Sequence, residues 1–227
     1  MKTDYTRARR YLMRKDPVLA NVIRQIGACD LPNVPRQPPF MALAEAIASQ
    51  QLSVKAADTI FGRFCALFGP DNIPDPQRLL ALHDDAIRAA GFSRAKVLFL
   101  RDLATHVSDR RLVLDHLHEH DDQQVLAQLT AVKGIGVWTA EIFLMFRLQR
   151  SDVFPAHDLG LVKAAQKLYG LRQRPTRKKL LRMAETWRPY RSVAAWYLWR
   201  SLSLPATSAS PSKRRLNESR SRRQRPE

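Results

Sequence analysis

The glycines of the stretch VKGIGVWTAEIFLMF have a spacing that could create an anion site. Gly134 and Gly136 flank one apolar residue, and the residues after them carry apolar side chains at helical spacing, so a tight turn leads directly into a helix. Glycine permits backbone conformations and a close approach that side chains would block. The amides that open the helix would face outward beside the positive end of its dipole, where a phosphate binds.

The order of elements around this turn narrows the interpretation. A helix, an apolar-x-Gly-Ile-Gly turn and a second helix that opens with Thr139 form the pattern of a helix-hairpin-helix, which would present its amides to the DNA backbone. A glycine turn of this kind can also join two helices without binding a ligand. Two features favour DNA. The chain is basic, and the segment VFPAHDLGLVKA places Asp158 at a helix start 22 residues after Gly136.

Charge and length indicate the class of partner. The chain has 227 residues, 45% of them hydrophobic, and a formal net charge of +17. Seven Lys or Arg and two Glu lie from Pro205 onward, so residues 1–204 keep a net charge of +12. A basic field favours polyanions, above all nucleic acid, although an acidic membrane surface stays an alternative.

Neither a signal peptide nor a membrane span is visible in the sequence. The N-terminus has basic residues without a continuous apolar region, and no apolar run reaches transmembrane length. We therefore expect a cytoplasmic protein with no membrane partner. It would be associated with the nucleoid in a bacterium and nuclear in a eukaryote.

Helix punctuation recurs along the chain and predicts an all-α fold of about ten short helices. Apolar residues recur at helical spacing between turn residues, and strand-like alternation is missing. The predicted helix starts are Ser53, Asp75, Ser93, Asp121 or Asp122, Asp158, Thr176 and Ser192. Two cysteines, Cys29 and Cys65, are too few for a disulfide scaffold or a four-cysteine zinc or iron–sulfur site.

Two segments differ from the helical pattern. The segment DLPNVPRQPPF is rich in proline and precedes a helix, so we expect a rigid connection. Residues 205–227 combine Pro, Ser and Arg with almost no large apolar side chain, which predicts a disordered basic tail.

Five ordered segments give the chain a resemblance to a known family. They are PFMALAEAIASQQLSVKAA, GFSRAKVLFLRDLA, LTAVKGIGVWTAEIFLMF, DVFPAHDLGLVKA and WRPYRSVAAWYLWR. Across residues 38–202 they resemble the helix-hairpin-helix (HhH-GPD) base-excision DNA glycosylases, and among them the 3-methyladenine DNA glycosylase II (AlkA) type.

The resemblance implies a two-lobed glycosylase domain over residues 1–204, with the active site in the cleft between the lobes. We expect one lobe to comprise residues 1–42 and 152–204 and the other to comprise residues 43–151. The region before the first segment is too short for the extra mixed-sheet domain of longer relatives.

Asp158 falls on the catalytic aspartate of the family. Base excision breaks the glycosidic bond through an oxocarbenium-like sugar, so a carboxylate there can stabilise positive charge and orient or deprotonate a water. An alkylated purine is cationic and leaves neutral, so no strong general acid is needed. The other interpretation is that Asp158 only caps its helix, and both can hold.

The resemblance also implies which chemistry is missing. Trp138 stands where bifunctional relatives such as endonuclease III carry a nucleophilic lysine, so no Schiff base with the sugar is expected and the enzyme should be monofunctional. Trp138 and Trp199 match positions where aromatic rings line the base pocket, and core packing is their alternative. Trp187 and Trp196 are assigned to the core. Ile142 replaces a tyrosine of the better-known bacterial pattern, so a pocket of different shape is expected.

DNA contacts are expected from two loops. In the segment SQQLS, Gln51 occupies the position of the side chain that fills the hole left by the extruded base, with Leu52 as the substitute candidate and Ser53 beside them. Gln51 can also be an ordinary polar loop residue. The expected DNA-binding residues of the hairpin are Lys133, Gly134, Ile135, Gly136 and Thr139.

One structural cation and no required cofactor are expected in this interpretation. The resemblance implies a structural monovalent cation on hairpin carbonyls near Val132 and Ile135. The count of two cysteines excludes a four-cysteine iron–sulfur cluster, and no required cofactor is expected. The histidine-rich segment HLHEH is interpreted as a solvated surface rather than a metal site, because a fixed fourth ligand is missing.

The sequence therefore predicts a monomeric, monofunctional glycosylase. It would flip alkylated purines of the 3-methyladenine and 7-methylguanine type out of double-stranded DNA and hydrolyse them from the sugar. A non-catalytic helix-hairpin-helix DNA-binding module and a glycosylase for oxidised or deaminated bases stay open as alternatives.

Overall fold

The structure is a computed structural model that describes residues 3–33 and 37–205. Over these residues the chain forms twelve α-helices and no strand, which confirms the predicted all-α class. The helices are α1 (Tyr5–Lys15), α2 (Pro17–Ile26), α3 (Pro39–Ser49), α4 (Val54–Cys65), α5 (Pro76–Ala81), α6 (Asp84–Ala89), α7 (Arg94–Ser108), α8 (Asp122–Thr130), α9 (Val137–Phe146), α10 (Leu159–Leu168), α11 (Arg177–Ala184) and α12 (Arg191–Ser201). Short 3-10 helices occupy Leu31–Asn33, Ala66–Phe68, Leu114–His116 and Glu185–Trp187.

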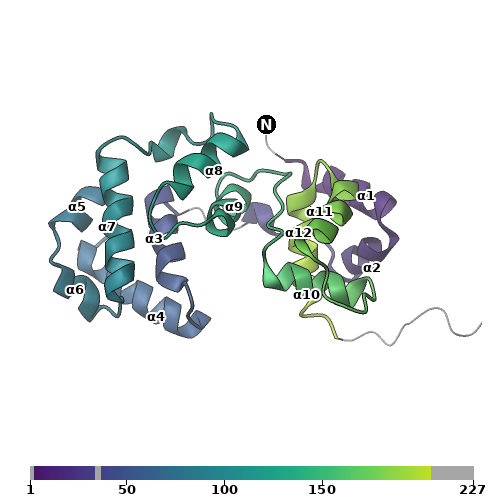
Figure 1. Ribbon diagram of the computed structural model, residues 1–227, viewed down its shortest axis with the longest axis horizontal. Helices are drawn as coiled ribbons and strands as arrows, with labels where there is room; N and C mark the ends of the chain where they lie inside the picture. Colours follow the sequence, from purple (N-terminus) through teal and green to yellow (C-terminus); the bar gives the residue numbers. More distant parts are fainter. Residues whose placement is uncertain (1–2, 34–36, 206–227) are drawn as a thin grey trace, which may run out of the picture.

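The helices form two groups with α9 between them (Figure 1). In one group α5 and α3 pack on α7, and α3 also packs on α4. In the other group α2 and α10 pack on α12, and α1 packs on α2, so the first and the last described helices belong to the same group. The boundary suggested by the sequence, between residues 42 and 43, lies inside α3. The division into lobes stays a prediction.

Side-chain caps start most helices, because the first amides of a helix have no partner within it. The side chains that accept a backbone N–H at a helix start include Ser53, Asp75, Ser93, Asp121, Asp158 and Thr176, all as predicted. Ser192 was wrong as a cap, because α12 begins at Arg191 and Tyr190 occupies the cap position. The buried Ser192 hydroxyl instead accepts the amide of Val153 and donates to its carbonyl.

Two helices near the N-terminus, α1 and α2, were not among the helices whose starts were predicted. Asp4 caps α1, and Asp16 caps α2 by accepting the amides of Val18 and Leu19. Asp16 is buried and also accepts the hydroxyl of Tyr169 and the indole N–H of Trp187. A single carboxylate thus joins the start of α2 to residues 153 and 171 positions later in the chain.

The core contains the side chains that the sequence assigned to it. Trp187 and Trp196 are 1% and 7% exposed, and Cys29 and Cys65 are buried free thiols. None of the helices in the described part of the chain is long and apolar enough to cross a membrane. The disordered basic tail was predicted for residues 205–227. Of these, all but Pro205 lie outside the described residues.

Candidate active site

Asp158 lies at the start of α10, and the exposed His157 separates it from the buried residues 153–156. Its Oδ1 atom accepts the backbone N–H of Leu161 at 2.8 Å, so the predicted capping role is confirmed. The cap fixes the carboxylate relative to the helix, since its position no longer depends on a free rotamer.

Two indole rings hold the same carboxylate from two other helices. Trp138, in the first turn of α9, donates its Nε1–H to Oδ2 of Asp158 at 2.9 Å. Trp199, in α12, donates its Nε1–H to Oδ1 at 2.8 Å. An ionised carboxylate offers about four lone-pair sites, and three N–H groups occupy three of them. Roughly one acceptor site therefore remains for a water or a sugar.

Gly160 is a site residue that the sequence analysis missed. A Cβ atom at this position would lie 2.9 Å from Oδ1 of Asp158 and 3.1 Å from Cδ1 of Trp199. Those separations are shorter than ordinary van der Waals contact, so any side chain would displace the carboxylate or the indole. The only sequence signal was the glycine two positions after Asp158, in the segment HDLG.

The two tryptophans differ in their surroundings. Trp138 is 45% exposed, which is unusual for an indole. Trp199 is half-buried, and its ring stacks on Phe146 with centroids 6.0 Å apart and planes 28° apart. Both indoles have their N–H groups on Asp158, so both sequence-predicted pocket residues contact the predicted catalytic carboxylate. Their role in binding a base stays a prediction.

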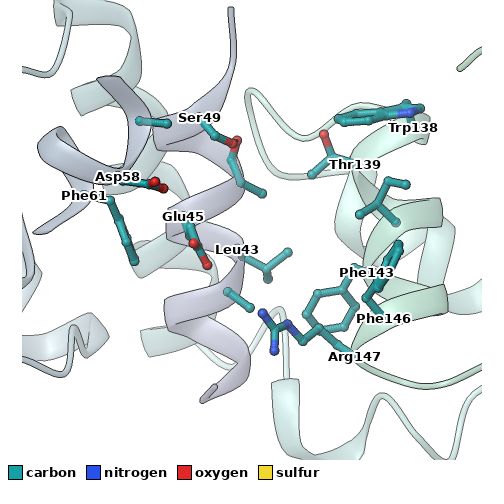
Figure 2. Close-up of a pocket in the computed structure, with 14 residues that line it drawn as sticks. Leu43, Glu45, Ser49, Asp58, Phe61, Trp138, Thr139, Phe143, Phe146 and Arg147 are labelled. Atoms are coloured by element: carbon teal, nitrogen blue, oxygen red, sulfur yellow. The ribbon is translucent and has the colours of Figure 1, made fainter. Parts of the chain in front are cut away.

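A cavity of about 290 Å³ adjoins Trp138 (Figure 2). It lies between α9 on one side and α3 and α4 on the other. Trp138, Ile142 and Phe146 line it at successive turns of α9. Ile142, the position that departs from the bacterial pattern, thus belongs to the cavity wall, and its aliphatic side chain sets the shape there.

The two hairpin glycines have different structural roles. Gly134 has φ +83°, and a Cβ there would lie 2.3 Å from the ring of Phe99, so both conformation and packing require glycine. Gly136 precedes α9 in extended backbone, and a Cβ there would meet nothing within 4 Å. Among residues 3–33 and 37–205, no side chain accepts the amides at the start of α9. At Gly136 the helix amides therefore have no side-chain cap, and the space beside them is open.

The other hairpin residues divide between surface and interior. Lys133 is exposed, and its amide donates to Oδ2 of Asp102 at 2.8 Å. Ile135 and Thr139 are 3% and 6% exposed, and Thr139 lines the cavity rather than the outer surface. Both side chains pack inward, so a DNA contact at these two positions would be made by backbone groups. Their DNA-binding role stays a prediction.

The expected cation on the hairpin carbonyls stays a prediction. The carbonyl of Val132 accepts the amide of Ile135 at 3.1 Å, which leaves it a second lone pair. Within residues 3–33 and 37–205 no three His, Cys, Asp or Glu side chains gather as a metal site. In the histidine-rich segment, His116 pairs with Glu119, as a solvated surface would.

The loop that carries the proposed plug is fixed to the hairpin. Gln51 is exposed with φ +59°, a conformation that non-glycine residues rarely adopt, and Leu52 is 39% exposed. The side chain of Gln50 donates to the carbonyl of Gly134 at 2.8 Å. Lys96 donates to the carbonyls of Ala48 and Gln50 at 2.7 and 2.8 Å. The sequence analysis missed Gln50 and Lys96, whose contacts lie far away along the chain.

The chain resembles known proteins over most of its length. Residues 44–189 match the HhH-GPD superfamily of base excision DNA repair proteins. DNA-3-methyladenine glycosylase 1 of Schizosaccharomyces pombe is 33% identical over 205 residues, which cover 89% of this chain and 90% of that protein.

Two solved structures share the arrangement of helices. A DNA-3-methyladenine glycosidase from Bacillus halodurans has a TM-score of 0.77 and 37% identity, over 89% of this chain and 92% of that one. A 3-methyladenine DNA glycosylase from Schizosaccharomyces pombe in complex with abasic DNA has a TM-score of 0.77 and 30% identity. That match covers 89% of this chain and 100% of that one.

Proposed function

Because the chain belongs to the HhH-GPD superfamily of base excision DNA repair proteins, we propose that it is a DNA glycosylase that releases alkylated purines from duplex DNA. Relatives named DNA-3-methyladenine glycosylase support the substrate class, and a structural relative in complex with abasic DNA supports duplex DNA as the partner. The observation that carries the proposal is the Asp158 carboxylate, which two indole N–H groups hold in place.

The arrangement suits hydrolysis of an N-glycosidic bond. The bond between the sugar C1′ and the purine nitrogen breaks, and its electron pair neutralises the positive charge of the alkylated purine. Positive charge then develops on the sugar, where the Asp158 carboxylate stabilises it. Water attacks C1′, and the carboxylate accepts its proton through the acceptor site that the three N–H donors leave. The products are the free base and an abasic site.

The proposed enzyme is monofunctional. Trp138 occupies the first turn of the helix after the hairpin, and an indole cannot form the Schiff base that an amine forms with the sugar. The reaction consumes only water, so we propose no cofactor for it. We also propose that the protein acts as a monomer at the DNA, on the nucleoid of a bacterium or in the nucleus of a eukaryote.

A non-catalytic binding module is the main alternative from another class. Such a module needs the hairpin amides but has no use for a carboxylate held by two indoles. The position of Asp158, between Trp138 of α9 and Trp199 of α12, therefore favours an enzyme.

Base release from a panel of damaged duplexes tests the proposal. We expect release of 3-methyladenine and 7-methylguanine from methylated DNA, intact strands until alkali is added, and no covalent adduct after borohydride treatment. Release only of oxidised or deaminated bases would shift the substrate class. An inactive wild-type protein, or a borohydride-trapped adduct, would contradict the proposed function or its monofunctional form.

A further inference from the structure

We propose that Glu45 recognises the positive charge of the flipped base in the cavity beside Trp138. The inference rests on the proposed glycosylase function and assigns a specificity residue to it. Nothing in the sequence analysis singled out Glu45, because it is one polar residue on a mostly apolar helix.

The cavity is placed to receive a base whose sugar lies at Asp158. Trp138 lines the cavity, and the same indole donates its N–H to the Asp158 carboxylate. The cavity and the carboxylate are therefore separated by no more than one indole ring. The volume of about 290 Å³ is close to the roughly 300 Å³ at which small-molecule pockets begin. A single purine fits that scale better than a larger ligand.

The apolar walls suit an aromatic cation. Phe61 of α4 faces the cavity from one side, and Phe143 and Phe146 of α9 line the other (Figure 2). The face of an aromatic ring attracts a cation electrostatically, and stacking adds dispersion. These walls favour a flat, electron-poor ring, but the rings carry no net negative charge to pair with a cation.

Glu45 supplies the charge complement that the rings lack. Its half-buried side chain lines the cavity from α3 (Figure 2). No hydrogen bond or ion pair with another described residue engages its carboxylate. A carboxylate that is partly withdrawn from water and has no hydrogen bond or ion pair among the described residues is available to a cationic ligand.

The cavity wall keeps a net negative charge, although the positive charge of Arg147 offsets part of that of Glu45. Arg147 lines the same cavity, but its guanidinium donates to Oε1 of Gln37 at 3.2 Å. Burial lowers the pKa of Arg147, and the negative charge of Glu45 opposes that shift. Asp58 adds a second, exposed carboxylate on the α4 side, so the wall carries two negative charges and one positive charge.

The chemistry predicts where in the reaction this attraction acts. The base is cationic while it is bound and becomes neutral as the glycosidic bond breaks. A carboxylate beside the base therefore stabilises the flipped substrate more than it stabilises the transition state. Glu45 should therefore help to capture an alkylated purine over a normal, neutral one, and it should not accelerate bond cleavage.

Single-turnover release of 7-methylguanine, measured against enzyme concentration, tests this inference. We expect Glu45→Gln to raise the half-saturating enzyme concentration about tenfold, as the loss of one partly screened charge interaction would. The maximal rate should stay within about threefold of wild type. Glu45→Asp keeps the charge, so its half-saturating concentration should lie between those of wild type and Glu45→Gln.

Two controls separate charge recognition from other effects. Glu119→Gln removes the same charge from an exposed site and should behave as wild type. Binding to a duplex with an abasic-site analogue should be equal in all variants, because no base enters the cavity.

Several results would overturn the inference. They are an unchanged half-saturating concentration for Glu45→Gln, equal losses for Glu45→Gln and Glu45→Asp, or a fall confined to the maximal rate. Weakened abasic-site binding together with a lower melting temperature would make Glu45 structural. A wild-type protein that releases no base would instead contradict the proposed function itself.

Discussion

At the scale of single residues, three donors and one glycine define what the Asp158 carboxylate can do. The amide of Leu161 and the indoles of Trp138 and Trp199 fix both oxygens in place. Gly160 leaves the space in which that arrangement fits. Orientation of this kind matters in catalysis, because a misplacement of about 1 Å can cost two orders of magnitude in rate.

Gly160→Ala should lower base release by about 10- to 100-fold without unfolding the protein. The added methyl group would lie 2.9 Å from Oδ1 of Asp158 and push the carboxylate from its position. Single-turnover base release and a thermal melt measure the two effects. Gly62→Ala is the matched control, since a Cβ there meets nothing within 4 Å, and it should keep full activity. Full activity of Gly160→Ala would show that the geometry of the carboxylate is not critical.

Glu141 should make stability depend on pH. Burial raises the pKa of Glu141 from 4.5 to about 7, although Arg177 opposes the rise, and its Oε2 atom has no hydrogen-bond partner among the described residues. A carboxyl whose folded pKa is raised binds its proton more tightly in the folded state. Its contribution therefore becomes unfavourable as pH rises from the unfolded pKa of 4.5 through the folded pKa of about 7.

The test is the melting temperature of Glu141→Gln. We expect a gain of about 2–4 °C at pH 8, which corresponds to roughly 1 kcal/mol for a chain of this size, and a much smaller gain at pH 4.5. The modest size reflects a side chain that solvent still partly screens. An equal gain at both pH values would mean that the ionisation of Glu141 does not matter.

At the scale of elements, the hairpin and the loop after α3 form one unit. The side chain of Gln50 donates to the carbonyl of Gly134, and Lys96 donates to the carbonyl of Gln50. The turn that should hold a phosphate is thus bonded to the loop that should hold the plug. Gln51 adopts its rare conformation between these fixed neighbours, so the loop is already ordered before DNA arrives.

Substitution of the two hairpin glycines should separate folding from DNA binding. Gly134→Ala places a methyl group 2.3 Å from the ring of Phe99 at φ +83°, so we expect a clear loss of melting temperature. Gly136→Leu enters open space and should melt near wild type. It should nevertheless weaken binding to damaged and undamaged duplex alike by about tenfold, because its side chain occupies the expected position of the phosphate. Normal DNA binding by folded Gly136→Leu would reduce the hairpin to a structural joint.

Contacts between residues close in sequence could be predicted, and contacts between residues far apart in sequence could not. Ser93 and Thr176 were correct as helix caps because a cap contacts an amide three residues away, which a local pattern reveals. Ser192 was wrong because its hydroxyl bonds Val153, 39 residues away. The contact of Gln50 with Gly134 spans 84 residues and has no local signature. The inward packing of the Thr139 and Ile135 side chains likewise has no local signature, and the DNA-binding role of these two positions stays a prediction.

At the scale of the whole molecule, the distribution of charge sets the encounter with DNA. The net charge is +17 over 227 residues, and residues 1–204 keep +12 of it. A field of this sign attracts a polyanion before any specific contact forms. Composition could therefore predict the class of partner. It could not predict how Trp138, Trp199 and Asp158 meet, because that depends on how α9, α10 and α12 pack.

DNA affinity should fall steeply with salt, even without residues 205–227. Each phosphate that the protein neutralises should contribute about −0.9 to the slope of log affinity against log salt. Deletion of residues 205–227 removes a net charge of five, so the slope should become shallower while base release persists. Filter binding or fluorescence anisotropy across a salt series measures this. Equal affinity of both proteins at every salt concentration would exclude an electrostatic role for the deleted segment.

The most direct test of the whole account is base release by Asp158→Asn. An amide keeps the shape of the carboxylate but loses the charge that should stabilise the sugar cation and accept the proton of water. We expect single-turnover release of alkylated purines from methylated duplex DNA to fall by about 1,000-fold or more. Affinity for a duplex with an abasic-site analogue should stay within a few fold of wild type, since the hairpin contacts are untouched. Release at a near wild-type rate by this variant would remove Asp158 from the mechanism and contradict the account.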